Sequence, residues 1–565
     1  MEKEHGIDMI SVVATNIVSP LGFTTDENYR AVRGCRSMLA RYDCWCGIPE
    51  PFVASLFSDE QRDKLRIENH TLFESVAIRS IKDALEHCNV DVKSPRTLFI
   101  LSTTKANVDD LGKSYYLSPG ESARKIANYI GFVGAPIVVC NACISGVDAQ
   151  LLAFRLLSSG EYDHAVVCGA DVVTPFVVTG FLSFKSLALE ECRPFDIERT
   201  GLNLGEAAAT IVFSRDTDGD NAWRLCSGAM SNDAYHVSAP SPKGDGSYRA
   251  TSKVLEGVAI NDLALLSLHG TATMFNDQME SKAIERAGLS DIPLSALKGY
   301  YGHTLGAAGV LESIITMRAL DDGIVLGVRG FEEIGVSGRV NISATEREAK
   351  GCTFLKMISG FGGCNGALLF SKRPCDKEQI LEDVSLRVRH RAKITHNSVV
   401  IDGRNMPCEG MGRTLLTTLY KSCVGDYPKF YKMDTLSKLA LLATELLVRE
   451  EGVSAEPCSV VLFNRSSSII ADSKHRESIQ DVENFYPSPL VFLYTLPNIA
   501  LGEVAIRNNF TGETSLYILE ERDEEVMRRV IKSIMKQPDI TRLITGWINC
   551  DAEDNFEADL QIITK

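Results

Sequence analysis

With 565 residues, the chain is too long for one ordinary domain, and its 45% hydrophobic residues can fill large packed cores, so two or three globular units are expected. Its 24% charged and 7% aromatic residues are ordinary for a globular protein and argue against a disordered chain. A formal net charge of -15 argues against non-specific nucleic-acid binding, because a phosphate backbone would repel such a surface.

The first residues carry no recognisable targeting segment. Glu2, Lys3 and Glu4 lie among only short apolar pieces, which is unlike a secretory signal. No apolar run reaches the roughly 18 residues that a membrane-spanning helix needs. The 16 cysteines lie mostly singly in apolar stretches, as buried residues of a reducing compartment do. We therefore expect a cytoplasmic protein without a membrane span.

The first 370 or so residues alternate glycine-punctuated apolar runs with helical patterns, which predicts an α/β fold with buried strands. A helix is expected from His70 to Cys88, where apolar residues recur on one face. Strands are expected over Arg96 to Leu101, Ala135 to Val139 and Ala165 to Gly169.

A candidate nucleophile follows the second of these strands. The strand reaches Cys140 and runs into Asn-Ala-Cys143-Ile-Ser-Gly, and a helical pattern begins at Val147. Because a thiol at a helix N-terminus meets free N–H groups and the positive end of the helix dipole, we expect the Cys143 thiolate to be favoured. The C-x-x-C formed with Cys140 could serve redox or zinc chemistry, but no second ligand pair accompanies it. Taken alone, Cys143 could equally be a buried structural residue.

Two histidines follow strand-like pieces further along the chain. The apolar run Leu263 to Leu268 ends in His269, and a strand-like piece near Pro293 leads through Lys298 to His303. We expect both histidines at strand ends, beside glycines that leave space for a ligand. Singly, each of these residues has an ordinary structural interpretation.

A new globular section is expected after a polar stretch around residues 372–381. It repeats the element order of the first half, with helices over Thr435 to Arg449 and Glu524 to Met535 and strands over Ser459 to Phe463, Leu490 to Tyr494 and Leu543 to Ile548. No Cys occurs from residue 498 to 539, where a counterpart of Cys143 should fall, and no His occurs after residue 475. This section is therefore predicted to be non-catalytic.

The densest basic stretch lies between the two sections and comprises Arg387, Arg389, His390, Arg391 and Lys393. It predicts a solvated linker or the edge of a strand. An acidic carrier protein could dock on it, but the sequence does not show that one does.

The order of the motifs resembles that of the elongating β-ketoacyl-acyl-carrier-protein synthases of the thiolase superfamily. The resemblance covers residues 8–373 and comprises Ser19-Pro20-Leu21-Gly22, the Cys143 motif, Arg193-Pro194-Phe195-Asp196, Gly205-Glu206-Ala207, Asp233-Ala234-Tyr235-His236, the His269 and His303 motifs, and Gly360-Phe361-Gly362-Gly363-Cys364-Asn365. It implies a thiolase-like α/β fold, a duplicated α-β-α-β-α layered core, to which a C-terminal α/β half-unit is added. The implied domains are residues 8–215 and 216–373 of the synthase, a linker over 374–389, and a degenerate half-synthase over 390–565.

The resemblance also implies the roles of the site residues. Cys143 corresponds to the nucleophile that carries the acyl group, and His269 and His303 to the pair that binds the malonyl thioester carbonyl during loss of carbon dioxide. Two imidazole donors aimed at an enolate oxygen would stabilise its charge. The remaining roles implied are support of the histidines by Lys298 with Glu312, an oxyanion hole from the N–H groups of Cys143 and Phe361, a gate formed by Phe361, and pantetheine binding by Thr271 and Thr273.

No cofactor or metal is implied beyond the phosphopantetheine of an acyl carrier protein, which would be the partner. A homodimer or a heterodimer with another synthase-like subunit is expected, in fatty acid, aryl polyene or polyketide-type synthesis. The motif departs from the family at Ser359, usually Phe, and Cys364, usually Thr, which leaves the behaviour of the gate open. The tail is similar to a reduced N-terminal half of the same family, best over residues 496–503, and is expected to cover or contact the core.

Three other classes of protein remain as alternatives. A non-catalytic chain-length or scaffold partner of a synthase heterodimer usually lacks the nucleophile that this chain retains. A thiolase would use a second catalytic cysteine near Phe361, for which Cys364 is the candidate. A cysteine protease would use a Cys/His pair but would not explain two histidines and a lysine.

Overall fold

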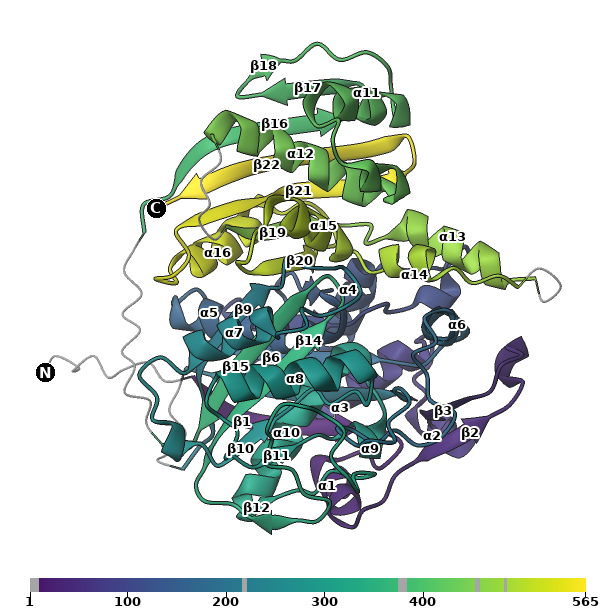
Figure 1. The fold of residues 1–565 in the computed structure, drawn as a ribbon, viewed down its shortest axis with the longest axis vertical. Coiled ribbons are helices and arrows are strands. Elements are labelled where there is room, and N and C mark those ends of the chain that lie inside the picture. The colour runs from purple at the N-terminus through teal and green to yellow at the C-terminus, as the bar shows by residue number, and fades with distance from the viewer. Residues whose placement is uncertain (1–9, 216–220, 374–383, 453–457, 482–484) are drawn as a thin grey trace, which may run out of the picture.

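The computed structural model describes residues 10–215, 221–373, 384–452, 458–481 and 485–565. These ranges form three copies of one α/β unit: the first unit (residues 10–215), the second unit (221–373) and the tail unit (384–565) (Figure 1). Each copy holds a five-stranded sheet with the same topology, three parallel strands followed by two antiparallel ones. The strand orders are β5-β4-β6-β8-β1, β11-β10-β14-β15-β9 and β20-β19-β21-β22-β16.

The strands of these sheets are short and mostly buried. The first unit uses β1 (Ser11–Val18), β4 (Thr97–Ser102), β5 (Ile137–Val139), β6 (His164–Asp171) and β8 (Ala207–Ser214). The second unit uses β9 (Arg224–Asn232), β10 (Leu265–Ser267), β11 (Leu294–Ser295), β14 (Thr353–Gly360) and β15 (Cys364–Ser371). The tail unit uses β16 (Arg387–Thr395), β19 (Ser459–Asn464), β20 (Thr514–Ile518), β21 (Arg542–Ala552) and β22 (Asn555–Thr564). Peripheral strands are β2 (Leu39–Tyr42), β3 (Phe52–Ser55), β7 (Leu204–Gly205), β12 (Ile324–Val325), β13 (Arg347–Glu348), β17 (Ser398–Ile401) and β18 (Arg404–Asn405).

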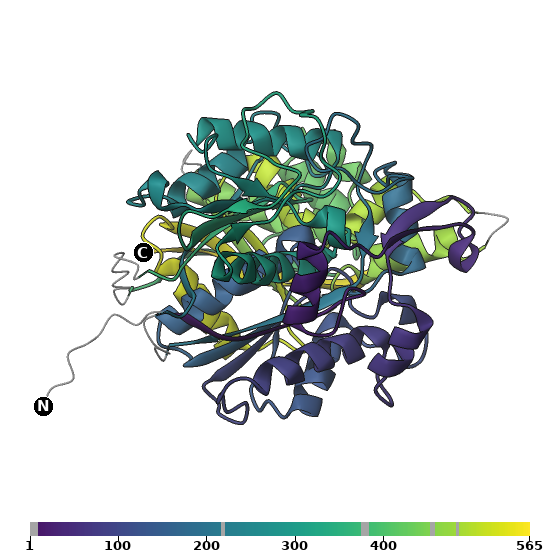
Figure 2. The ribbon, with the colours of Figure 1, turned by 90° about the horizontal axis from the view of Figure 1, so that it is seen from below.

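Helices cover both faces of the sheets. In the view from below, helices of the first and second units form opposite outer layers, while one helix of each unit packs between their two sheets (Figure 2). The first unit has α1 (Thr25–Arg33), α2 (Asp59–Leu65), α3 (Leu72–Leu85), α4 (Pro119–Ile130), α5 (Ser145–Ser158) and α6 (Pro175–Ser183). The second has α7 (Asp245–Val254), α8 (Met274–Arg286), α9 (Lys298–Tyr301) and α10 (Ala308–Asp321). The tail has α11 (Arg413–Cys423), α12 (Thr435–Glu451), α13 (Ile469–Ile479), α14 (Pro489–Tyr494), α15 (Ile499–Asn508) and α16 (Glu524–Met535).

Local chemistry accounts for where these helices begin. The helix expected from His70 to Cys88 is α3, and Thr71 and Glu74 close a capping box at its start. Each side chain of that box satisfies one N–H group that the first helical turn leaves without a partner. The apolar face of α3 buries Phe73, Val76 and Ile81 in the core that the first unit shares with the tail.

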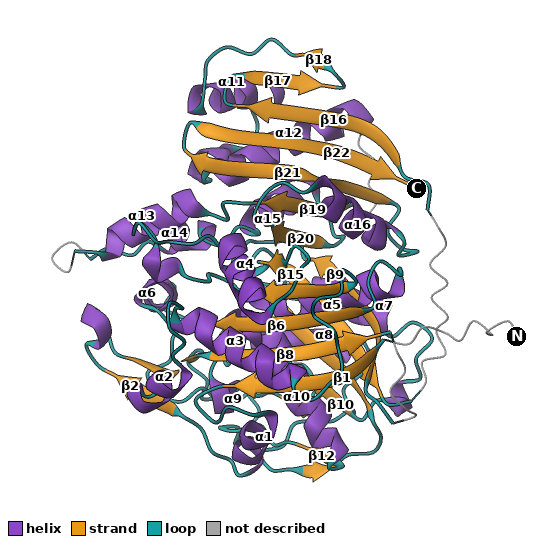
Figure 3. Cartoon of the chain, turned by 180° about the vertical axis from the view of Figure 1, so that it is seen from behind, coloured by secondary structure: helices purple, strands orange, loops and turns teal. Residues whose placement is uncertain are grey.

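The tail unit is joined to the first unit by a continuous sheet. Strand β20 pairs antiparallel with β5, with Tyr517 opposite Val139, and the Cys140 N–H donates to the Leu516 carbonyl at 3.2 Å. The two sheets thereby run into one another across the molecule (Figure 3). A buried ion pair strengthens this seam, because the Arg155 guanidinium contacts both carboxylate oxygens of Glu513 at 2.8 and 2.7 Å.

The fold class predicted from the sequence is confirmed, but one predicted tail strand is wrong. Leu490 to Tyr494 lies in helix α14, which Pro489 begins and the Ser488 side chain caps by accepting from the Val491 N–H. Ser at the N-cap followed by Pro at the first helical position is a helix start. The counterpart of β5 is instead β20, which follows 20 residues later.

The predicted linker lies partly outside the described residues, which resume at residue 384, and β16 begins at Arg387. The basic stretch is not a linker, but it does lie at a strand edge, because only residues 392–395 of β16 pair with β17, while residues 387–390 pair with β22 alone and are mostly exposed. Its Arg391 is neutralised by Asp559 at 2.6 Å, a contact that makes the stretch less basic than its sequence.

Two further expectations concern compartment and membrane. No helix in the described ranges has the length and hydrophobicity of a bilayer-spanning segment. Among the free cysteines of the described ranges seven are buried, whereas Cys35, Cys44 and Cys46 are exposed.

Candidate active site

Cys143 lies in a tight turn between β5 and α5. The turn is a single 3-10 segment, Ala142–Ile144, and Ala142 adopts a positive φ of 49°. A residue other than glycine in this region stores backbone strain, which is common where a reactive side chain must be held out of a regular element. The Cys143 side chain is only 9% exposed.

The two histidines approach Cys143 from the second unit. His269 follows β10, as expected, but His303 follows the short helix α9 rather than a strand. Gly302 makes this turn possible, because its φ is +72° and an added Cβ would lie 2.2 Å from the Leu204 carbonyl oxygen. The Cys143 sulfur and one nitrogen of each histidine all lie within 4.8 Å of one another.

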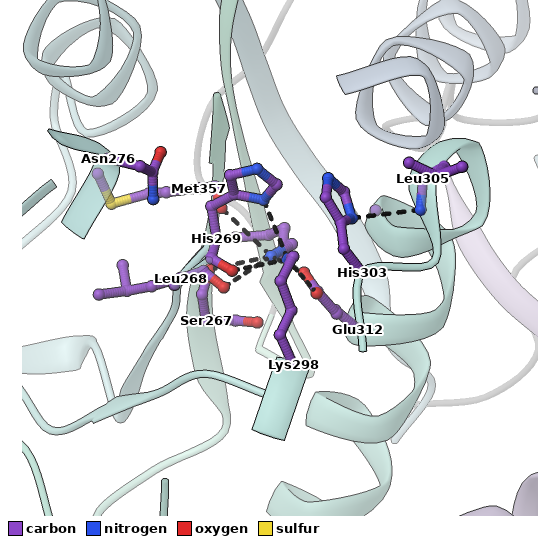
Figure 4. A network of polar contacts seen from close by, with 12 residues as sticks. Ser267, Leu268, His269, Asn276, Lys298, His303, Leu305, Glu312 and Met357 are labelled. Carbon is purple, nitrogen blue, oxygen red and sulfur yellow. Dashed lines mark hydrogen bonds and ion pairs between the residues drawn. The ribbon is translucent and has the colours of Figure 1, made fainter. Parts of the chain in front are cut away.

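Hydrogen bonds fix which ring nitrogens carry protons (Figure 4). His303 Nδ1 accepts from the Leu305 backbone N–H at 3.2 Å, so its proton is on Nε2. His269 Nδ1 lies 3.0 Å from Lys298 Nζ, and an ammonium group can only donate, so His269 also carries its proton on Nε2. His303 Nε2 is buried without a hydrogen-bond partner, so it is free to donate to a substrate.

Both imidazoles are held neutral. Burial lowers the pKa of His269 well below 6.5, and the nearby positive charge of Lys298 lowers it further. Burial and Lys298 act in the same direction on the pKa of His303. Two neutral rings with Nε2–H groups on one cavity are hydrogen-bond donors rather than proton acceptors.

Lys298 holds His269 in place through hydrogen bonds. Its ammonium group donates to His269 Nδ1, to the His269 carbonyl at 2.6 Å and to Glu312 Oε1 at 2.7 Å. These contacts agree with the supporting role expected for Lys298 with Glu312. Glu280 adds to the same support, because its two carboxylate oxygens accept from the N–H groups of His269 and Gly270 at 2.8 and 2.7 Å.

A second buried lysine, which the sequence motifs do not predict, lies beside this group. Lys356 lies in the middle of β14, is 0% exposed, and places Nζ 2.6 Å from Glu312 Oε2. Its signal in the sequence is a single charged residue inside the otherwise apolar run Phe354-Leu355-Lys356-Met357-Ile358. Fully buried lysines are rare unless they are paired, so such a position deserves a functional interpretation.

The expectation that the Cys143 thiolate is favoured is wrong for the resting site. Burial raises the pKa of the Cys143 thiol to about 12, and this outweighs the lowering by Lys298 and by the N–H groups of Cys143 and Phe361. Desolvation disfavours the charged form of a buried thiol more than one helix N-terminus favours it. Both N–H groups nevertheless point at the sulfur, where they could serve as a pair of oxyanion donors.

A cavity of about 330 Å³ opens onto these groups. Its lining includes Cys143, His269, His303, Phe361, Thr271 and Thr273, and the two threonine hydroxyls lie 2.9 Å apart. The structure thus brings all of these predicted site residues to one cavity, with Lys298 and Glu312 beneath it.

A second, much smaller cavity of about 20 Å³ lies behind Phe361. Cys143, Phe181 and Phe361 line it from the core, and Phe492 and Leu496 line it from the tail unit. The Phe361 ring is held between Phe181 and Phe184, with ring centroids 6.4 and 5.4 Å away.

The tail also contacts the backbone of the Phe361 loop. Asn498 Nδ2 donates to the Phe361 carbonyl at 2.8 Å. Gly502 packs so tightly on Gly362, the residue after Phe361, that an added Cβ would lie 2.7 Å from the Gly362 carbonyl oxygen. Residues of the tail therefore complete the surroundings of the predicted gate.

The alternative cysteine chemistries do not fit this geometry. Cys364 is buried and its sulfur faces Thr514 Oγ1 of the tail at 3.1 Å, outside the lining of the main cavity. It is therefore not placed as the second catalytic cysteine of a thiolase. Cys140 is a free thiol directed at the Thr104 carbonyl, 3.3 Å away, so the C-x-x-C forms no disulfide with Cys143.

The spacing of Cys143, His269 and His303 would also suit a thiophilic metal ion. The ammonium groups of Lys298 and Lys356 lie beside this cluster, however, and they would repel a divalent cation. The same positive charge favours an anionic reaction intermediate.

Fold and site together define a class. The molecule is a thiolase-like α/β protein whose duplicated core brings a buried cysteine of the first unit to two neutral histidines of the second.

Comparison with known proteins shows which family part of the chain is similar to. Residues 104–219 match the family model described as beta-ketoacyl synthase, N-terminal domain, and residues 224–332 match that of its C-terminal domain. These two stretches, which together make up less than half of the chain, are similar to the β-ketoacyl synthase family.

Two curated relatives match in sequence. The putative mitochondrial 3-oxoacyl-[acyl-carrier-protein] synthase of Schizosaccharomyces pombe is 30% identical over 272 residues, which are 44% of this chain and 64% of that protein. The 3-oxoacyl-[acyl-carrier-protein] synthase 2 of Staphylococcus aureus is 28% identical over 275 residues, 45% of this chain and 66% of that protein. This chain thus spans just under two thirds of the length of these relatives.

Solved structures extend the likeness to the tail. The structure of the PfaC keto synthase-chain length factor has a TM-score of 0.75 at 15% identity. The match covers 98% of this chain and 78% of the PfaC chain. The ketosynthase ApeO in complex with its chain length factor ApeC, from Xenorhabdus doucetiae, has a TM-score of 0.56 at 24% identity. The match covers 66% of this chain and 100% of the matched chain of that complex. At these identities the likeness shows the fold.

Proposed function

We propose that the chain catalyses decarboxylative condensation of an acyl thioester, carried on Cys143, with a malonyl thioester on an acyl carrier protein. The observation that carries the proposal is the convergence of one thiol and two imidazole Nε2–H groups on one cavity. A non-catalytic scaffold subunit needs neither a cysteine nucleophile nor imidazole N–H donors that face a cavity.

Loading would begin with attack of the Cys143 sulfur on the incoming thioester carbonyl. The new C–S bond forms as the carrier C–S bond breaks, and the thiol proton leaves with the pantetheine sulfur. The N–H groups of Cys143 and Phe361 would hold the negative oxygen of the tetrahedral intermediate. These donors compensate in the transition state for the burial that keeps the resting thiol neutral.

Condensation would use the two histidines. When the malonyl carboxylate leaves as carbon dioxide, the electron pair of the broken C–C bond passes to the thioester oxygen, which becomes an enolate. His269 and His303 each donate one Nε2–H to that oxygen. The enolate carbon then attacks the acyl carbonyl, a C–C bond forms, and the Cys143 sulfur departs as the thiolate.

Replacement of His303 by Ala tests this division of labour. We expect acyl transfer to Cys143, followed by mass spectrometry of the intact protein, to persist, and condensation to fall by about 10²- to 10³-fold, the usual loss for one such donor. Cys143→Ala is the matched control and should take up no acyl group. A Cys143→Ala protein that still extends an acyl chain would sink the proposal.

We further propose that the tail unit replaces a synthase-like partner subunit. Its β20 occupies the free edge of β5, the strand that leads to Cys143, and its α14–α15 region closes the small cavity behind Phe361. A second subunit could use this edge only if the tail left it. The PfaC structure, in which a ketosynthase is named together with a chain length factor, supports this interpretation.

The acyl chain would then end against the tail. Phe492 lines the small cavity and packs so closely on α6 that an added Cβ at Gly180 would lie 2.1 Å from its ring. We expect Phe492→Ala to lengthen the longest acyl group that Cys143 accepts from a series of acyl carriers, measured by intact mass. Leu490→Ala, on the exposed side of the same helix, is the matched control and should leave the acyl series unchanged. An unchanged series in Phe492→Ala would contradict this role of the tail.

A further inference from the structure

Lys356 is a buried cation to which the reaction above gives no role. It lies opposite Ser267 in the register of β14 with β10, the strand that leads into His269. Its Nζ also lies 3.2 Å from the Met357 carbonyl and 3.4 Å from those of Ser267 and Leu268. The side chain therefore ends directly beneath the His269 turn.

One carboxylate is shared by two lysines at this point. Glu312 Oε1 accepts from Lys298 at 2.7 Å and Oε2 accepts from Lys356 at 2.6 Å. Distances this short are typical of ammonium–carboxylate bonds, so both lysines carry a proton. Burial lowers the pKa of Lys356, and Glu312 partly offsets that effect.

The charge count at this cluster differs from that of a simple ion pair. Two ammonium groups and one carboxylate leave a net charge of about +1, whereas Lys298 and Glu312 alone would sum to zero. All three groups are buried, where charges are poorly screened. Burial raises the pKa of the neighbouring Glu280 to about 7, so its carboxyl group is only partly charged near neutral pH and an excess of positive charge remains beneath the position where the enolate oxygen would form.

We propose that Lys356 is a positioning residue for decarboxylation, which neutralises Glu312 so that Lys298 remains an uncompensated cation under His269. The proposal rests on the proposed function. Lys356 would touch no substrate and would act through Glu312, Lys298 and the carbonyl groups that precede His269.

The same cluster should set the acid limit of the reaction. The titratable and charged groups around the two imidazoles are Cys143, Glu280, Lys298, Glu312 and Lys356. Each histidine Nδ1 already accepts a hydrogen bond, so protonation of either ring would set two donors against each other. Because Lys356 lowers the pKa of both rings, its loss would let them protonate at higher pH.

Lys356→Met is the first test, made in the full chain with malonyl carrier protein as the probe. We expect malonyl decarboxylation to fall about 10- to 100-fold, the size of effect typical of supporting residues, and acyl loading, which uses only the Cys143 thiol, to fall by a smaller factor. The acid limb of the pH–rate profile should move to higher pH. A purely structural role would lower the rate by the same factor at every pH and would overturn the proposal.

A double variant separates charge from packing. Lys356→Met/Glu312→Gln restores the net charge of +1 on Lys298, so it should decarboxylate faster than Lys356→Met alone. A double variant slower than the single one would overturn the proposal. If Lys356→Met does not fold, Glu312→Gln serves instead, since its net charge of +2 should move the acid limb to lower pH, and an unmoved limb would overturn it.

Alkylation of Cys143 by iodoacetamide needs no carrier and distinguishes this proposal from the proposed function. Loss of net positive charge should raise the thiol pKa, so Lys356→Met should be alkylated more slowly than the parent at the same pH. Equal rates would count against Lys356. A parent protein that fails to condense acyl and malonyl carriers would instead contradict the proposed function.

Discussion

Helices α5 and α16 occupy the same place in two copies of one unit, and they differ in what surrounds them. In α5 every residue from Ser145 to Leu157 is buried, including charged Asp148 and Arg155. In α16 only one side is buried, and Glu524, Glu525 and Arg528 are exposed. The buried side of α16 joins the same apolar core as α5 and α10.

The difference shows that α16 presents a solvent-exposed surface of the tail unit on one side and packs against the rest of the molecule on the other. Charged residues spaced three and four apart on the outer side of α16 form ion pairs with each other, as Glu525 does with Arg528 and Arg529. Its apolar side is complementary to the first unit. The same topology is therefore used once for the unit that carries Cys143 and once for a unit that covers it.

The turns that precede α5 and α16 differ in the side chains that they carry. The pairing of Val139 with Tyr517 and of Cys140 with Leu516 relates β5 to β20 by a pseudo-two-fold axis. The segment between β20 and α16, residues 519–523, corresponds in element order to the Cys143 turn between β5 and α5, and it contains the exposed Glu521. We expect Cys143→Ala to abolish condensation and Glu521→Ala to leave it within about 2-fold, because surface changes away from the site act weakly. Product formation from acyl and malonyl carriers measures both, and a comparable loss in Glu521→Ala would assign chemistry to the tail.

The seam provides the next largest expected effect. Arg155→Met leaves the buried Glu513 carboxylate without its partner, which should lower the free energy of unfolding by about 3–5 kcal/mol. Arg155→Met/Glu513→Gln removes the uncompensated charge and should recover part of this loss. Urea unfolding followed by circular dichroism measures both variants. Full stability of Arg155→Met would show that the seam does not depend on the ion pair.

Single truncations on the two helices sharpen the comparison directly. Leu152→Ala in α5 removes a fully buried side chain and should cost about 2–5 kcal/mol. Arg528→Ala on the outer side of α16 should change stability by less than about 0.5 kcal/mol. Equal costs in urea unfolding would mean that the outer side of α16 is covered in solution.

The last expected effect is a pH dependence at the seam. Burial, followed by the charge of Glu513, raises the pKa of Asp148 to about 7 in the folded protein. The ordinary value for an unfolded Asp is about 3.9, so the folded state binds more protons between these values and its stability falls as pH rises from about 4 to 7. Asp148→Asn should remove a slope of at most about 1.4 kcal/mol per pH unit. Unfolding curves at pH 5 and 7 test this, and parallel behaviour of parent and variant would contradict it.

Much of the fold could be predicted because its determinants are local. The capping box at Thr71 and Glu74 and the apolar strand at Ser459 are visible in short windows of sequence. Helix α14 was mistaken for a strand because an apolar run of five residues has no clear period, although Ser488-Pro489 marks a helix start. The pairing of β20 with β5 depends on contacts between distant segments, which periodicity does not encode.

The site divides in the same way. The motif residues Cys143, His269 and His303 were identified because the resemblance supplies their order, and the structure places them on one cavity. The state of the thiol was mispredicted because burial is a tertiary property that opposes the local helix dipole. Lys356 and Phe492 were missed because their importance arises only from where β14 and α14 place them.

The hydrogen bond from Asn498 to the Phe361 carbonyl ties the Phe361 loop to the tail. A backbone shift that swings Phe361 aside to admit a growing chain would break this bond and loosen α15. Under the proposed function, each round of elongation would then destabilise α15 of the tail unit. The amide protons of α15 should therefore exchange faster in the protein acylated on Cys143 than in the free protein.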